Sequence, residues 1–172
     1  MNISALTKTI GKRSRNIRYF TDTDSLGEKW GYYMSDHFLC RFPHQIPPKL
    51  TVKIMATFTT TSQEAALLNG IEGHVTNSMR SHLTDMFAPE YPDTTYTKLK
   101  LEMSDSTGIA DIYHDGKEYR FYNTTYTDIM DDAVKRGCRE GVLRLTDEHE
   151  NSIIIMPIKP RNIPEYLKEV TP

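Results

Sequence analysis

The chain has 172 residues, of which 38% are hydrophobic and 26% charged, a composition typical of a compact folded protein rather than a disordered one. Its 21 Lys and Arg residues are balanced by 23 Asp and Glu residues, so a net charge of −2 excludes a uniformly basic nucleic-acid binder and leaves only local basic surfaces. Two cysteines, Cys40 and Cys138, cannot form a disulfide framework, and no apolar run is long enough to cross a membrane or resembles a signal peptide, so we expect an intracellular protein.

Residues 2–12 predict a short helix, because Ile3, Leu6 and Ile10 recur at spacings of three and four. Either Asn2 or Ser4 can cap its start. A basic stripe follows the helix and its exit: Lys8, Lys12, Arg13, Arg15 and Arg18. These cations are either solvated charges that complement the helix dipole or a surface that faces phosphate groups.

Short aromatic and β-branched segments follow, and they predict strands over 16–22 and within 30–43, with a turn near 35–37. Pro47 and Pro48 interrupt regular pairing. The alternation of Leu50, Val52 and Ile54 predicts a further strand over 49–58. Residues 62–87 change to helical spacing, with Gly70 and Gly73 as points where the helix can bend or split.

The last third predicts strands again. Residues 97–103 alternate, with Leu99, Leu101 and Met103 on one face, and residues 108–123 predict a hairpin around Asp115 and Gly116.

Residues 124–137 predict a second short helix that ends at Gly137, with its apolar face on Tyr126, Ile129, Met130 and Ala133. Lys135, Arg136 and Arg139 crowd its C-terminal end. A final hairpin over 141–160 holds Ser152–Met156, which we expect to be buried on both faces. A tail over 161–172 either docks or frays. This order of elements predicts an α+β fold with antiparallel sheets.

Several residue sets are candidate chemical sites. His37, Cys40 and His44 do not share one strand face, so a metal site there is disfavoured. Asp22 and Asp24 lack the later ligands of a calcium loop and read as a solvated turn.

Asp128, Asp131 and Asp132 suit the start of the second helix without further function. Cys138 is the one candidate nucleophile, but none of six scattered histidines is placed as its base. We therefore expect no enzyme, no cofactor and no metal.

The last third resembles the closing segment of bacterial-type DNA sliding clamps, the β subunit of the replicative polymerase. The matching residues are Asn123, Tyr126, Met156, Pro157, Ile158 and Lys159. The first third is similar to the opening of a clamp module of the kind found in phages, with matches at His37, Leu39, Arg41 and Pro43. The resemblance covers roughly residues 2–50 and 96–160, and 62–95 has no counterpart in it.

This resemblance implies a single DNA-clamp-like domain over 1–160, with antiparallel sheets, short helices on one face, a helical insertion over 62–95 and a tail over 161–172. It also implies a phage-type processivity factor in the cytoplasm of a bacterial host, which binds duplex DNA without reading its sequence and works with a polymerase. The expected DNA contacts are Lys8, Lys12, Arg13, Arg15, Arg18, Lys135, Arg136 and Arg139.

One chain supplies only one module, so a closed ring would need about six copies. The alternative is a small phage-encoded interaction protein that inhibits a host enzyme or defence complex, using the helix over 62–87.

Overall fold

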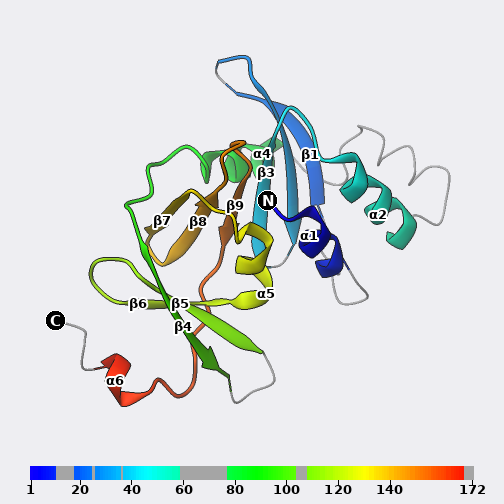
Figure 1. Ribbon diagram of the computed structural model, residues 1–172. Coiled ribbons are helices and arrows are strands. Elements are labelled where there is room, and N and C mark those ends of the chain that lie inside the picture. Colours follow the sequence, from blue (N-terminus) through cyan, green and yellow to red (C-terminus); the bar gives the residue numbers. More distant parts are fainter. Residues whose placement is uncertain (11–17, 25, 36, 59–76, 104–107, 169–172) are drawn as a thin grey trace.

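The computed structural model describes residues 1–10, 18–24, 26–35, 37–58, 77–103 and 108–168. Within them, strands form two antiparallel sheets with short helices around them (Figure 1). The strands are β1 (Arg18–Thr23), β2 (Lys29–Ser35), β3 (Phe38–Pro43), β4 (Thr95–Glu102), β5 (Ile109–His114), β6 (Tyr119–Asn123), β7 (Lys135–Arg139), β8 (Val142–Thr146) and β9 (Ser152–Ile155). The helices are α1 (Ile3–Thr9), α2 (Pro48–Phe58), α4 (Asn77–Asp85), α5 (Thr124–Thr127), the 3-10 helix η1 (Asp128–Met130) and α6 (Glu165–Lys168). The predicted α+β class with antiparallel sheets is confirmed.

The six-stranded sheet, here sheet A, has the order β1-β2-β3-β9-β8-β7, which places β9 between β3 and β8. All four residues of β9 are buried. Ile153 and Ile155 face one core, and Ile154 faces the other, so the strand is covered on both sides. Burial of each isoleucine contributes about 2 kcal/mol. The predicted burial of the isoleucine run is confirmed, but Met156 is 39% exposed and does not continue it.

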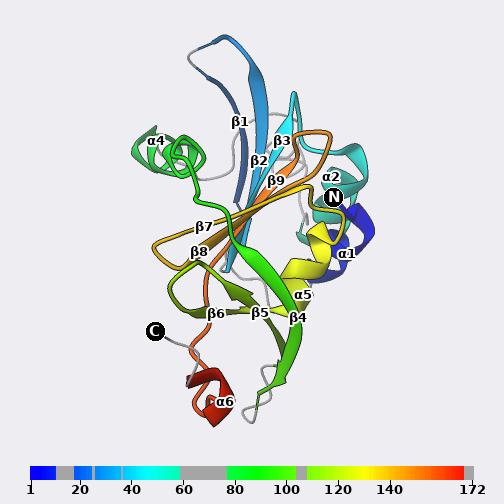
Figure 2. The ribbon, with the colours of Figure 1, turned by 60° about the vertical axis from the view of Figure 1, so that its left-hand side comes forward.

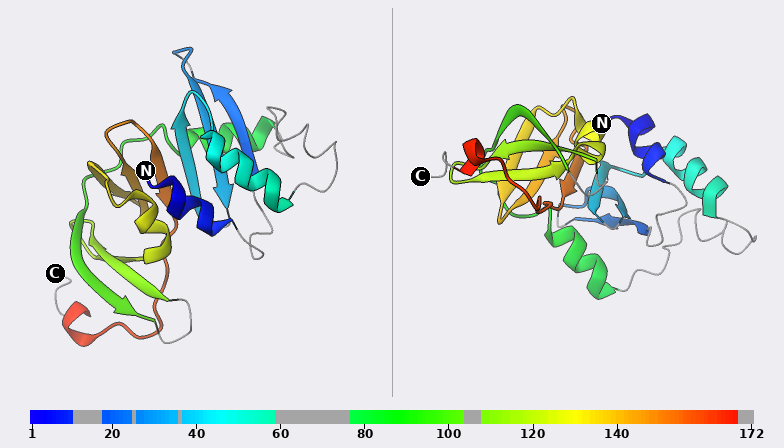
Figure 3. Two further views of the ribbon diagram at one scale, coloured as in Figure 1. Left: turned by 45° about the vertical axis from the view of Figure 1, so that its right-hand side comes forward. Right: turned by 90° about the horizontal axis from the view of Figure 1, so that it is seen from below.

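Helices cover both faces of sheet A (Figure 2). On one face α1 and α2 lie side by side (Figure 3, left), joined by a 2.8 Å hydrogen bond from Lys49 Nζ to Ser4 Oγ. The Asn2 side chain caps α1 by accepting from the Ala5 amide at 2.9 Å, as one of the two predicted caps. On the opposite face lies α4, whose Leu83 packs in the cluster around Phe20.

The three-stranded sheet, here sheet B, has the order β4-β5-β6. Its Tyr113 and Tyr122 join the same core as α1 and α2. On the other side of sheet B, Leu167 of α6 is buried against Ile112 and Phe121. The end of the described chain therefore docks on sheet B. Of the two predictions for the tail, docking or fraying, docking is correct as far as Leu167.

The predicted strand over 49–58 is wrong, because these residues form the helix α2. Leu50 and Ile54 are buried, whereas Val52 between them is 63% exposed. A separation of four residues fits both a strand face and a helix face, so Leu50 and Ile54 satisfied either period. Pro48 begins the helix, at the position where a proline ring is compatible with helical geometry.

The predicted helix over 124–137 is also wrong beyond its first two turns. Helix α5 and η1 end at Met130, and Lys135–Arg139 form strand β7 instead. The turn that follows has Glu140 at φ 52° and Gly141 at φ 82°, a two-residue connection with positive φ at both positions. Such a turn joins antiparallel strands tightly. The three cations at 135, 136 and 139 therefore lie on a strand of sheet A and not at a helix end.

The remaining predictions divide between described and undescribed residues. Strands and hairpins predicted over 16–22, 30–43, 97–103, 108–123 and 141–160 are confirmed in type where these residues are described, and residues 16, 17 and 36 lie outside them. The regular alternation predicted over 97–103 is wrong, because the pairing shifts between Tyr96 and Lys100 and Leu99 is 45% exposed. Of the helix predicted over 62–87, the described part is helical at Asn77–Asp85, and residues 62–76 lie outside the described residues.

Gly31 of β2 allows the backbone of Gln45 and Ile46 to pass close to sheet A. A Cβ at this position would lie 2.4 Å from the Ile46 amide nitrogen and 2.6 Å from the Gln45 carbonyl carbon. Both neighbours are backbone atoms, so relief requires a shift of the segment that leads into α2.

We expect Gly31→Ala to lower the free energy of unfolding by about 3 kcal/mol, the upper end for overpacking. Gly116→Ala is the control, because Gly116 has φ +90° and open space, so that only a backbone cost of about 1 kcal/mol applies. Urea denaturation of both variants measures the difference. Equal losses would contradict the close approach at Gly31.

Candidate functional site

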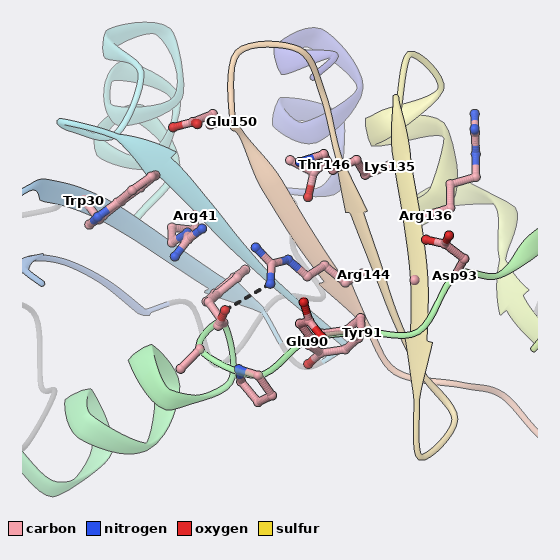
Figure 4. Close-up of a pocket in the computed structure, with 14 residues that line it drawn as sticks. Trp30, Arg41, Glu90, Tyr91, Asp93, Lys135, Arg136, Arg144, Thr146 and Glu150 are labelled. Carbon is pink, nitrogen blue, oxygen red and sulfur yellow. Dashed lines mark hydrogen bonds between the residues drawn. The ribbon is translucent and has the colours of Figure 1, made fainter.

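A cleft of about 530 Å³ opens on the α4 face of sheet A. One side is the segment 87–93, which follows α4 and runs toward β4 (Figure 4). Its lining residues are Trp30, Arg41, Phe87, Ala88, Pro89, Glu90, Tyr91, Asp93, Lys135, Arg136, Gly137, Arg144, Thr146 and Glu150. The cleft therefore combines aromatic rings with cations from three strands.

Arg41 and Arg144 lie beside each other in the middle of the cleft (Figure 4). Arg41 of β3 pairs with Ser152, and Arg144 of β8 pairs with Ile154. Because Ser152 and Ile154 are two residues apart on β9, both arginines leave the sheet on the same face. The two strands are separated by β9, and their side chains converge over it.

Aromatic rings surround both guanidinium groups. The Cζ atom of Arg41 lies 4.1 Å from the Trp30 ring centroid and 4.8 Å from that of Phe87. The Cζ atom of Arg144 lies 5.7 Å from the ring centroids of both Phe87 and Tyr91. Each such contact contributes about 1 kcal/mol when partly buried, so the rings hold the cations in place.

The two guanidinium groups are incompletely satisfied by the described residues. Arg144 donates to the Phe87 carbonyl oxygen at 3.0 Å, while the buried Nε of Arg41 has no hydrogen-bond partner among them. No ion pair between a described carboxylate and either group is present. An unpaired buried donor lowers the stability of the fold.

Burial also affects the pKa values of this pair. It lowers the pKa of Arg41, against the nearby Tyr32 hydroxyl and the charges of Glu150 and Asp24. Burial, and then the charge of Arg41, lowers the pKa of Arg144. Both groups remain cationic at neutral pH because arginine starts far above it. Two like charges held together favour binding of an anion between them.

The aromatic walls are fixed by hydrogen bonds of their own. Trp30 Nε1 donates to Asp24 at 3.0 Å, and Tyr91 Oη donates to the Met86 carbonyl oxygen at 2.9 Å. Gly137 allows Tyr91 to lie against β7, since a Cβ there would be 2.6 Å from the Tyr91 Cβ. The rings therefore stand at set positions on the two sides of the arginine pair.

Among the described residues, the predicted DNA contacts do not form one site. Lys135 lines the cleft, and Arg139 shares its face of β7, because both pair with β8 residues that alternate with Leu143 and Leu145. Arg136 pairs with Leu145 and faces the other way, although it also lines the cleft edge and a neighbouring hollow with Tyr96. Lys8 lies on α1, across sheet A from the cleft (Figure 2).

Arg18 begins β1, and Lys12, Arg13 and Arg15 lie outside the described residues. The expectation of cations at the ends of two helices is therefore wrong for the second helix.

Sequence reasoning missed the arginine pair. Arg41 belongs to the clamp-like pattern, and Arg144 belongs to no pattern in the sequence analysis. The sequence did contain one indication, the alternation of side chains along each strand. Tyr32 and Leu39 belong to apolar strand faces, which Arg41 and Arg144 interrupt. Which strands are neighbours was needed before the two arginines could be brought together.

The other candidate site residues also do not come together in one site among the described residues. His37 and His44 are exposed, and Cys40 is buried on the opposite core face. Cys138 is buried on β7, where its Sγ lies 3.4 Å from Tyr122 Oη. Asp24 organises the β1–β2 turn by accepting from the Leu26 and Glu28 amides, as expected of a turn residue. Among the described residues, no group of three His, Cys, Asp or Glu side chains could hold a metal ion.

Because Arg41 has no carboxylate partner among the described residues, we expect its charge to contribute little to the stability of the fold. We expect Arg41→Met to leave the free energy of unfolding nearly unchanged. The loss of two cation–π contacts of about 1 kcal/mol each is offset by removal of a partly buried charge without a carboxylate partner, and methionine keeps the apolar stem. Arg120→Met is the control, since Arg120 pairs with Asp115 and Glu118. This control should lose about 1 kcal/mol. Urea denaturation tests both, and a larger loss for Arg41→Met would contradict the prediction.

Comparison with known proteins does not indicate a function, so the geometry of the cleft is the basis for one. No protein-family model matches the chain, and neither a curated protein nor a solved structure matches it significantly. Within the described part of the chain, none of the helices has the length and apolar character needed to cross a membrane.

Proposed function

We propose that the protein binds nucleic acid without catalysing a reaction, and that phosphate groups of the strand bind at Arg41 and Arg144. The observation that carries this proposal is the pair of half-buried guanidinium groups that make no ion pair with a described carboxylate. Guanidinium groups match phosphate oxygens geometrically, with two parallel hydrogen bonds.

The surroundings of the pair support a phosphate-bearing polymer. Lys135 and Arg139 extend the basic face along β7, so that charge continues beyond the cleft. Aromatic residues interleave with these cations, as in proteins that bind nucleic-acid strands.

The resemblance to sliding clamps suggests a narrower function, a processivity factor that assembles as a ring of about six copies. That function needs cations on two inner helices, whereas Lys135, Arg136 and Arg139 lie on β7. The proposal is therefore limited to binding by the cleft of one copy.

The test is fluorescence anisotropy with labelled oligonucleotides, both single strands and duplexes, at several salt concentrations. We expect salt-dependent binding by the unaltered chain, and affinity about tenfold lower in Arg41→Met and in Arg144→Met, equal to about 1.4 kcal/mol. Each variant should also make the salt dependence shallower, by about 0.7 to 0.9 in the logarithmic slope.

Arg120→Met is the matched control, because it removes the same charge outside the cleft. It should bind as the unaltered chain does. Absence of binding to every probe, or an equal loss in the control, would overturn the proposal.

A further inference from the structure

The cleft has features that separate a flexible single strand from a duplex. Its two arginines are recessed between the segment 87–93 on one side and Trp30 of β2 on the other (Figure 4). A phosphate reaches them only if the backbone that carries it can bend into the cleft. A duplex is stiff over many base pairs, whereas a single strand is not constrained in this way.

Acidic residues stand around the cations. Glu90, Asp93 and Glu150 line the same cleft, and Asp22, Asp24 and Asp85 line a second hollow that shares Arg41 with it. A duplex carries about one charge per 1.7 Å of its axis, so a broad duplex surface would meet these carboxylates. A strand that places one or two phosphates at the arginines avoids most of them.

Two aromatic rings are held in fixed positions beside the arginine pair. Trp30 and Tyr91 are both half-buried and lie on either side of the arginine pair. Their hydrogen bonds to Asp24 and Met86 hold them in place before any ligand binds. Stacking of a base on such a ring contributes about 1 to 3 kcal/mol, and it requires a base that is free of its partner.

We infer that the cleft binds single-stranded nucleic acid, with phosphate at Arg41 and Arg144 and unpaired bases stacked on Trp30 and Tyr91. This inference rests on the proposed function and adds the strandedness of the ligand and the role of its bases. DNA and RNA share both groups, so either strand can supply them.

The experiment compares three probes of about 12 nucleotides with the full chain: a thymine single strand, its duplex with adenine, and an abasic strand with the same phosphates. Trp30 is the single tryptophan of the chain, so tryptophan fluorescence reports directly on this wall of the cleft. We expect the thymine strand to bind at least about tenfold more tightly than the duplex or the abasic strand. Only the thymine strand should quench Trp30. A uridine strand of equal length shows whether RNA serves as well.

Tyr91→Leu identifies the base contact, because it should weaken thymine-strand binding about tenfold and abasic-strand binding much less, since for the abasic strand only the loss of the ring contact with Arg144 matters. Tyr119→Leu is the matched control, since Tyr119 is a half-buried ring on sheet B, next to His114. Duplex binding equal to that of the single strand, with sensitivity to Arg41→Met, would overturn this inference and leave the proposed function standing. Binding to none of the probes would overturn both.

Discussion

The structure depends on the packing of strand β9 between β3 and β8. Ile153 and Ile155 pack on one face of sheet A and Ile154 on the other, and these side chains join two groups of strands that are distant in sequence. Without this strand, β1-β2-β3 and the β7–β8 hairpin would be separate fragments with exposed apolar edges. The same pairing sets the register of Arg41 and Arg144, which lie opposite Ser152 and Ile154. The core and the cleft are therefore consequences of one set of contacts.

The cleft departs from the rest of the molecule in how its charges are satisfied. Elsewhere a charged group such as Arg120 has carboxylate partners, and the buried Asp111 accepts hydrogen bonds from Thr127 and Tyr96. Arg41 and Arg144 instead rest on aromatic rings, with a donor of Arg41 left unpaired by the described residues. A stable fold gains little from such an arrangement, whereas a binding site gains cations that have no carboxylate partner among the described residues. This contrast, rather than overall charge, supports the proposal of an anionic ligand.

The sequence predicted the local elements better than the site. The alternation around Gly116 and the apolar run at 152–155 were sufficient, because each hairpin is contained in a short segment. Leu50 and Ile54 could not distinguish a strand from a helix, since their spacing fits both periods. In the 124–137 segment, the helical spacing of the apolar residues extended the predicted helix too far. The turn at Glu140 and Gly141, just after this segment, makes β7 a strand of a hairpin. The arginine pair was beyond local patterns, because β3 and β8 become neighbours only through β9.

The position of β9 in the chain has a consequence for biosynthesis. Leu39 of β3 pairs with Ile154 of β9, which follows more than a hundred residues later in the chain. The edge of β3 therefore stays unpaired until β9 has been synthesised. A ribosome releases the chain from its N-terminal end, and β1, β2 and β3 emerge long before the strand that completes their sheet. During that interval Phe38, Leu39 and Cys40 have no β9 to pair with, and contacts of such high sequence separation form slowly. The nascent chain is thus most exposed to aggregation or chaperone capture just before its last strand is made.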